Sequence, residues 1–257
     1  MGVLQAKNIL LTRTVAQNQQ TAALLATYGA NPVYFPCLAI ETLSSELKAG
    51  LQALATAEKC GTDVIFSSQN GVDALFSCVA KLSEVLQGYR IIAVGHKTAE
   101  RLRKLGCNVD VIPQHASQQG LVANYEAVYP SNQPKRVFFF RAEQGSDVLA
   151  DYFARKHIPL QLIPSYRALC VQENPADVVQ KLQTQSIDAV LLGSAQVATC
   201  YAQKTAPLKL KYKPLLVVMS GQVAAAADKA GLKVQLVAKQ PSFAAMLDVL
   251  SDYYSLS

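Results

Sequence analysis

Two stretches of the sequence that lie 125 positions apart decide the fold. The first is IIAVGHKTAERLRKLGCNVDVIP, residues 91–113, and the second is LVVMSGQVAAAADKAGLKVQLVA, residues 216–238. Each pattern is typical of a strand, a turn of small or polar residues, an amphipathic helix that ends at a glycine, and a second strand. The same succession of elements at a constant spacing indicates that one sheet unit has been duplicated.

Two further pairs of segments match in the same way. These pairs are residues 9–36 with 137–164, and residues 63–72 (DVIFSSQNGV) with 188–197 (DAVLLGSAQV). Within the first pair, Arg13 stands opposite Arg141 and Pro36 stands opposite Pro164. Three matched pairs therefore predict that the chain contains two copies of one sheet unit.

Short β-type runs alternate with helical stretches from end to end, which is typical of parallel α/β sheets with helices on both faces. We expect strands at residues 9–12, 33–35, 64–67, 91–94, 109–112, 137–140, 160–163, 189–192, 216–218 and 234–237. Ten strands are too many for one small open sheet. We expect Pro36 and Pro164 each to close a strand and to mark a crossing between two lobes, with a ligand cleft between the lobes.

The composition narrows the class of protein. Of the 257 residues 51% are apolar and only 16% are charged, which excludes intrinsic disorder. The net charge of +6 suits an anionic ligand but is too small for a nucleic-acid-binding domain. The longest uncharged apolar run, residues 215–227, is shorter than the ~20 residues of a membrane span, so we expect no membrane insertion.

The six cysteines are scattered with no close pair, so the sequence suggests neither a zinc knuckle nor a disulfide framework. We interpret them as small buried hydrophobic residues. The N-terminal residues lack the pattern of a signal peptide, which favours a cytoplasmic protein. The chain also lacks the glycine-rich nucleotide fingerprints, the zinc-protease motif and the esterase motif. His96, His115 and His157 are isolated, and we therefore expect no metal site.

Hydroxyl and small polar residues follow several predicted strands, at the edge where open α/β sheets bind their ligands. Each group stands where a helix begins, so its residues either cap that helix or help to bind an anion at the helix N-terminus. Arg13 and Arg141 would add positive charge at the ends of matched strands, unless they form structural ion pairs there. Taken together, these residues favour an anionic ligand.

The motifs LLTR, IFSSQNGV, AVGHKTAERLRKLG, SQQGL, FFFRAEQGSDVL and PSYRAL, in this order, resemble the uroporphyrinogen-III synthase family over almost the whole chain. The resemblance implies an α/β fold of two flavodoxin-like lobes joined by a two-stranded connector. Lobe one would comprise residues 1–36 and 168–257, lobe two residues 41–163, and the connectors residues 37–40 and 164–167.

The same resemblance implies that the chain is a lyase which closes the linear tetrapyrrole hydroxymethylbilane, inverts its last ring and releases water, without a cofactor or metal. Hydroxymethylbilane would be its partner, with handover by the preceding pathway enzyme left open, and we expect a monomer. Tyr166 corresponds to the family's cleft tyrosine and is our candidate acid, although it could instead be a hinge aromatic that packs between the lobes. The expected substrate-binding residues are Arg13, Ser67, Ser68, Gln69, Thr98, Ser117, Arg141, Ser194 and Ser220.

The chain departs from the family pattern at two turns that matter for the site. Ser220 and Val223 stand where the first half has Gly95 and Thr98, and Gly193 replaces the threonine of a more usual aromatic-Thr-Ser turn. A homologue that binds a tetrapyrrole without converting it therefore remains the alternative to an enzyme. A two-lobed binding protein for another small anion is the second alternative, and the missing secretion signal counts against its periplasmic form.

Overall fold

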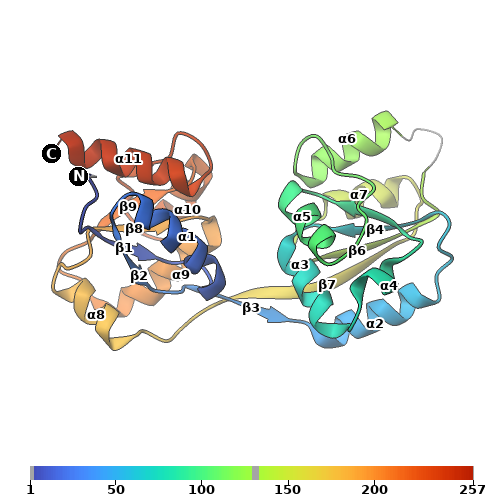
Figure 1. Cartoon of the computed structure of the whole chain (residues 1–257), viewed down its shortest axis with the longest axis horizontal. Helices are drawn as coiled ribbons and strands as arrows, with labels where there is room; N and C mark the ends of the chain where they lie inside the picture. Colours follow the sequence, from blue (N-terminus) through green and yellow to red (C-terminus); the bar gives the residue numbers. More distant parts are fainter. Residues whose placement is uncertain (1–2, 129–132, 257) are drawn as a thin grey trace. The chain divides into compact units, whose positions relative to one another are not determined.

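A computed structural model describes residues 3–128 and 133–256, and Figure 1 shows its course. The chain divides into two compact units with separate interiors. Unit 1 comprises Met1–Ala39 and Leu169–Ser257, and unit 2 comprises Ile40–Ala168. The first and last segments of the chain thus share one unit.

Unit 1 contains a five-stranded parallel sheet with the strand order β10-β9-β8-β1-β2. Its strands are β1 (Asn8–Leu11), β2 (Asn31–Tyr34), β8 (Ala189–Leu192), β9 (Leu215–Val218) and β10 (Leu236–Val237). Its helices are α1 (Val15–Thr27), α8 (Ala176–Gln183), α9 (Ala195–Thr205), the short 3-10 helix η1 (Ala206–Leu208), α10 (Gly221–Lys229) and α11 (Phe243–Leu256).

Unit 2 contains a second five-stranded sheet with the strand order β3-β7-β6-β4-β5, in which β4, β5, β6 and β7 pair in parallel. Its strands are β3 (Leu38–Thr42), β4 (Thr62–Phe66), β5 (Arg90–Ala93), β6 (Arg136–Ala142) and β7 (Leu160–Cys170). Its helices are α2 (Ser44–Ala55), α3 (Gln69–Cys78), α4 (Leu82–Leu86), α5 (His96–Lys104), α6 (Gln118–Val128) and α7 (Val148–Arg155).

Helices cover both faces of each sheet, as the alternating pattern predicts. In unit 1, α1 and α11 pack on one face and α8, α9 and α10 on the other (Figure 1). In unit 2, α6 and α7 pack on one face and α2, α3, α4 and α5 on the other. Central strands such as β6 are therefore buried on both sides, which explains the continuous apolar run Val137 to Phe140.

The predicted duplication is visible in the structure. The strand β5 and the helix α5 recur as β9 and α10 at a shift of 125 residues in every boundary. In each copy, a side chain from the segment after the helix accepts a hydrogen bond from the strand before the helix. Asp110 accepts from the backbone N–H of Ile91, and Gln235 accepts from the backbone N–H of Leu216. The two copies therefore share backbone geometry as well as sequence pattern.

Two expectations about individual strands were wrong. Pro164 does not close a strand but lies inside β7, because an irregularity opposite it, between Arg141 and Ala142, interrupts the regular ladder. The strand expected at residues 109–112 is reduced to one bridge, between Ile92 and Val111. The residue pattern did not predict the strand β3, whose first residues fall in the connector 37–40 that the family resemblance implies.

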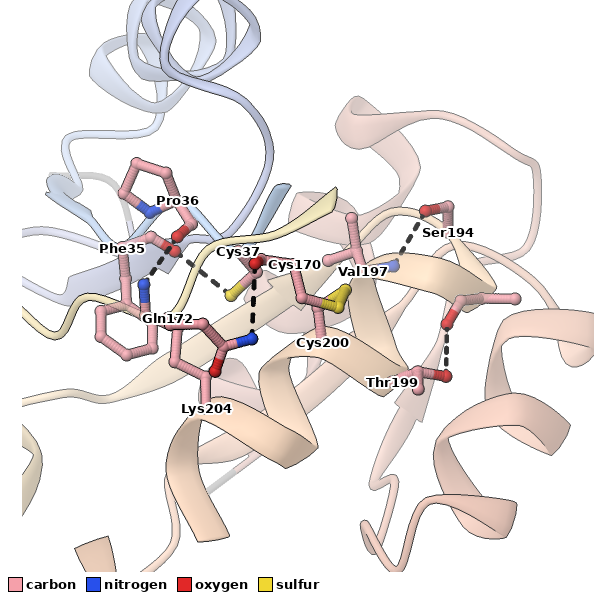
Figure 2. The surroundings of a disulfide bond; sticks show 11 residues. Phe35, Pro36, Cys37, Cys170, Gln172, Ser194, Val197, Thr199, Cys200 and Lys204 are labelled. Carbon is pink, nitrogen blue, oxygen red and sulfur yellow. Dashed lines mark hydrogen bonds between the residues drawn. A yellow bond between two sulfur atoms is a disulfide. The ribbon is translucent and has the colours of Figure 1, made fainter. Parts of the chain in front are cut away.

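The interpretation of all six cysteines as unpaired was also wrong. Cys170, at the end of β7, forms a disulfide with Cys200 on α9, and their Cα atoms lie 5.2 Å apart (Figure 2). The two residues are 30 positions apart, and only the packing of α9 on the sheet of unit 1 brings them together. Cys37 and Cys107 are buried thiols as expected, but Cys60 is exposed.

Candidate functional site

The candidate residues gather at the carboxyl edges of the two sheets. The helices α3, α5, α9 and α10 each begin directly after a strand, namely β4, β5, β8 and β9. Because these strands run parallel within their sheets, the starts of the helices that follow lie at the same edge of each sheet. The edge of unit 2 carries Ser67, Ser68, Gln69, Thr98, Arg141 and Tyr166, and the edge of unit 1 carries Arg13, Ser194 and Ser220.

In unit 2 the structure brings Tyr166 and Ser68 together. The phenol oxygen of Tyr166 on β7 lies 2.9 Å from Oγ of Ser68, the residue that caps α3. The same Oγ accepts a hydrogen bond of 3.2 Å from the backbone N–H of Gly71. Tyr166 is only 7% exposed. A hydroxyl held by a helix cap thus fixes the position of the buried phenol.

Four of the predicted serines are helix N-caps, as the simpler of the two interpretations predicts. Each accepts a hydrogen bond from the backbone N–H three residues further on, and these are Ser68, Ser117, Ser194 and Ser220. The side-chain oxygen of each is thereby engaged in capping. An anion at these edges would therefore meet chiefly the remaining N–H groups of the first helical turn.

Three more predicted residues lie at the same edge of unit 2 in different surroundings. Thr98 is buried in the first turn of α5, which begins after Gly95 without a side-chain cap. Gln69 is exposed at the first position of α3. The Oγ of Ser67 donates a long hydrogen bond of 3.4 Å to the carbonyl of Phe140.

The two matched arginines have different partners. Arg141 on β6 is buried, and its guanidinium donates to the carbonyl of Ser146 at 2.7 Å and forms an ion pair of 3.0 Å with Asp147. Arg13 follows β1 and lies over the ring of Phe243, with Cζ 5.0 Å from the ring centroid. Burial lowers the pKa of the Arg13 guanidinium, which nevertheless stays cationic at neutral pH. Among the described residues, Arg141 forms an ion pair with a carboxylate and Arg13 forms none.

Sequence reasoning missed two residues that surround Arg13. Asn18 on α1 is fully buried and accepts a hydrogen bond from the backbone N–H of Arg13 at 3.0 Å. Phe243 is the first residue of α11, 230 positions along the chain. No local sequence signal identifies Phe243; in the structure it packs against Gly193, where a Cβ would lie 2.8 Å from Cζ of the ring.

No group of three or more His, Cys, Asp or Glu side chains within residues 3–128 and 133–256 could hold a metal ion. None of the helices in these segments is long and apolar enough to cross a bilayer.

Comparisons with known proteins agree on one family. A family model described as uroporphyrinogen-III synthase HemD matches residues 19–248. The chain is 26% identical over 203 residues to the uroporphyrinogen-III synthase of Synechococcus elongatus, covering 78% of this chain and 75% of that protein. It is 22% identical to the porphyrin biosynthesis protein HemD of Ruminiclostridium josui over 94% of this chain, but it spans only 47% of that protein.

Solved structures show the same fold at low sequence identity. A mutant uroporphyrinogen III synthase from Thermus thermophilus matches 98% of this chain with a TM-score of 0.62 at 17% identity. Uroporphyrinogen-III synthetase from Helicobacter pylori matches 96% with a TM-score of 0.63 at 13% identity. The family model covers most of the chain, and on that ground the chain belongs to the uroporphyrinogen-III synthase family.

Proposed function

We propose that this protein is a uroporphyrinogen-III synthase, which cyclises hydroxymethylbilane to uroporphyrinogen III with inversion of the last pyrrole ring and loss of water. The observation that carries the proposal is the match of the family model to residues 19–248. The hydrogen-bonded pair of Tyr166 and Ser68 at the carboxyl edge of a parallel sheet supports it. A lyase of this kind needs one well-placed weak acid and several groups that bind carboxylates.

We also propose the finer architecture that the sequence predicts. The strands of unit 1, numbered in chain order within the unit, lie in the order 2-1-3-4-5, which is the flavodoxin-like order. This order supports a flavodoxin-like lobe of residues 1–36 with 168–257. The second proposed lobe, of residues 41–163, belongs to the sheet of unit 2, whose strands lie in the order 1-5-4-2-3. The proposed connectors are residues 37–40 and 164–167; β3 includes residues 38–40, and β7 includes residues 164–167.

The first chemical step is departure of the substrate's terminal hydroxyl group. Tyr166 donates its phenolic proton to this hydroxyl, which leaves as water, and the pyrrole nitrogen stabilises the resulting azafulvene cation. Ser68 accepts from the N–H of Gly71 and is free to donate its own proton to the oxygen of Tyr166. This arrangement keeps the phenolic proton available for the substrate and stabilises the phenolate that forms.

The second step is ring closure with inversion. The azafulvene carbon bonds to the substituted carbon of the last pyrrole, which gives a spiro intermediate. The bond from that carbon to its original methylene bridge then breaks, which makes this methylene carbon a second azafulvene. The second azafulvene carbon bonds to the free carbon of the last pyrrole, and the proton lost from that carbon returns to the phenolate of Tyr166. The protein contributes proximity and orientation, because unaided closure occurs at the free carbon without inversion. Backbone N–H groups at the starts of α3, α5, α9 and α10, together with Arg13, bind the acetate and propionate arms.

The experiment that tests this function is an assay of product isomers. Freshly prepared hydroxymethylbilane is supplied to the purified full-length protein, and the uroporphyrinogen isomers are oxidised and separated. An excess of isomer III over the unaided background supports the enzyme. If isomer I alone forms while the protein binds the tetrapyrrole, the chain is a non-catalytic binding homologue.

A further inference from the structure

The guanidinium of Arg13 differs from that of its counterpart in unit 2. Arg141 is paired with Asp147, whereas no carboxylate of the described residues forms an ion pair with Arg13. Its side-chain nitrogen atoms make no hydrogen bond to another described residue, and the side chain is partly exposed. Arg13 is therefore a half-buried cation whose hydrogen-bond donors are available to a ligand.

The backbone of Arg13 is held in place by a buried amide. Asn18, which is 0% exposed, accepts from the N–H of Arg13 and donates to the carbonyl oxygens of Arg13 and Leu11, all at 3.0–3.1 Å. The preceding residue, Thr12, donates its hydroxyl to the carbonyl of Leu191 on the neighbouring strand β8. The side chain of Arg13 thus starts from a rigid point at the carboxyl edge of the sheet.

The aromatic ring of Phe243 holds the other end of the side chain. Its centroid lies 5.0 Å from Cζ of Arg13, within the range of a cation–π contact. A phenyl ring has no oxygen or nitrogen acceptor, so this contact leaves the five N–H donors of the guanidinium without a conventional hydrogen bond and available to an anion. The ring also removes water from the side of the guanidinium that it contacts, which strengthens the attraction between the guanidinium and an anion.

The glycine at position 193 makes room for this ring. A Cβ on Gly193 would lie 2.8 Å from Cζ of Phe243 and 3.7 Å from Cδ of Arg13. Any larger residue would therefore displace the ring from its place over the guanidinium. Gly193, Phe243 and Arg13 form one arrangement, although they come from three distant parts of the sequence.

We propose that Phe243 is a positioning residue for Arg13, and that it holds the guanidinium so that its in-plane donors bind one carboxylate arm of the tetrapyrrole. The proposal rests on the function proposed above. Burial lowers the pKa of Arg13, and this effect agrees with a cation that has given up part of its hydration before the ligand arrives.

The test measures binding and turnover in a double-mutant cycle. The variants are Phe243→Leu, Phe243→Tyr, Arg13→Gln and the double variant Arg13→Gln with Phe243→Leu. For each, KM and kcat for isomer III formation are measured, together with the Kd for uroporphyrin III, a stable octacarboxylate probe that requires no turnover. Thermal unfolding is measured to check that each variant is folded. We expect Phe243→Leu to fold because leucine keeps the apolar packing of α11.

We expect Phe243→Leu to raise KM and Kd about tenfold while kcat changes less than twofold. Phe243→Tyr should raise Kd as well, because its hydroxyl is added at Cζ, the ring atom that packs against Gly193. In the Arg13→Gln background, Phe243→Leu should raise KM and Kd by less than a further twofold, because Phe243 acts through Arg13. Gly193→Ala should raise Kd in the same way. The added methyl group would contact Cζ at the far end of the Phe243 side chain, so the ring would move and the backbone would not.

An unchanged Kd for Phe243→Leu, or effects of Phe243→Leu and Arg13→Gln that multiply in the double variant, would overturn the proposal. Because the probe binds without reacting, these outcomes do not depend on catalysis. A wild-type protein that binds the probe but forms no isomer III would instead refute the proposed enzymatic function. The two failures are therefore distinguishable.

Discussion

At the scale of single residues, the phenol of Tyr166 is the group with the clearest chemical task. Its oxygen lies 2.9 Å from Oγ of Ser68, and its side chain is almost fully buried. We expect Tyr166→Phe to slow isomer III formation at least about tenfold, because the leaving hydroxyl loses its proton donor. The free energy of unfolding should fall by no more than about 1 kcal/mol, since Oγ of Ser68 keeps its bond from Gly71. An unchanged rate would remove Tyr166 from the acid role.

Ser68 has two tasks that one pair of substitutions can separate. It caps α3 and it contacts Tyr166. Ser68→Ala removes both contacts, so we expect a loss of about 1 kcal/mol in stability together with a lower kcat. Ser68→Thr keeps a hydroxyl and should restore both, which denaturant titration and the isomer assay would show. A full kcat in the alanine variant would mean that Ser68 only caps the helix.

How far single residues could be predicted depends on where their partners lie in the chain. The hydroxyl residues at the helix starts were predictable, because a cap is formed within four consecutive residues. The pairing of Arg141 with Asp147 was left open, although the two are only six positions apart, because charge alone does not fix the course of a loop. Phe243 was missed because the fold of the whole of unit 1 brings it to Arg13.

At the scale of elements, the matched helices α5 and α10 end in the same way. Gly106 and Gly231 follow them with φ angles of 77° and 76°, in the left-handed region that favours glycine. A Cβ on Gly231 or on Gly221, at the start of α10, would meet no atom within 4 Å. The two positions therefore differ in backbone conformation and not in available space.

This difference gives a matched pair of substitutions. We expect Gly231→Ala to lower the free energy of unfolding by about 1 kcal/mol, because alanine is strained at positive φ. Gly221→Ala should leave it unchanged within about 0.5 kcal/mol, since no such strain arises there. Denaturant titration of both variants checks the pair. Equal losses at the two positions would contradict the backbone explanation.

Elements were predictable where a local pattern specifies them. The duplicated strand and helix, β5 with α5 and β9 with α10, were predictable because apolar periodicity and a terminal glycine are features of neighbouring residues. The continuation of β7 through Pro164 was not, because the irregularity that accommodates the proline involves Arg141 and Ala142 on β6. The strand β3 pairs with β7, which is more than a hundred residues away in sequence. Pairing partners at such distances leave no local signal.

At the scale of the whole molecule, each unit has its own interior and only unit 1 carries the disulfide. The bond joins Cys170 to Cys200, while Cys37, Cys60, Cys78 and Cys107 remain free thiols. It closes a loop of about 30 residues, for which the chain-entropy model gives a stabilisation of about 3.6 kcal/mol. Reduction of the disulfide should therefore lower the stability of unit 1 and leave the stability of unit 2 unchanged.

Hydrogen exchange measured segment by segment tests this expectation. We expect Cys170→Ser, or added reductant, to speed exchange about four hundredfold in β8 and α9, because about 3.6 kcal/mol of opening free energy is lost. Exchange in β4 and β6 should not change, since their core belongs to unit 2. Cys60→Ser, which replaces an exposed free thiol, serves as the control.

A thiol count on the denatured protein checks the bond itself. Four of the six cysteines should react before reduction and all six after it. Six reactive thiols without reductant would show that the bond does not form. Faster exchange in both units after reduction would show that the two interiors unfold together. Because disulfides persist mainly in oxidising surroundings, the stability of unit 1 should then follow the redox state of the solution while that of unit 2 stays constant.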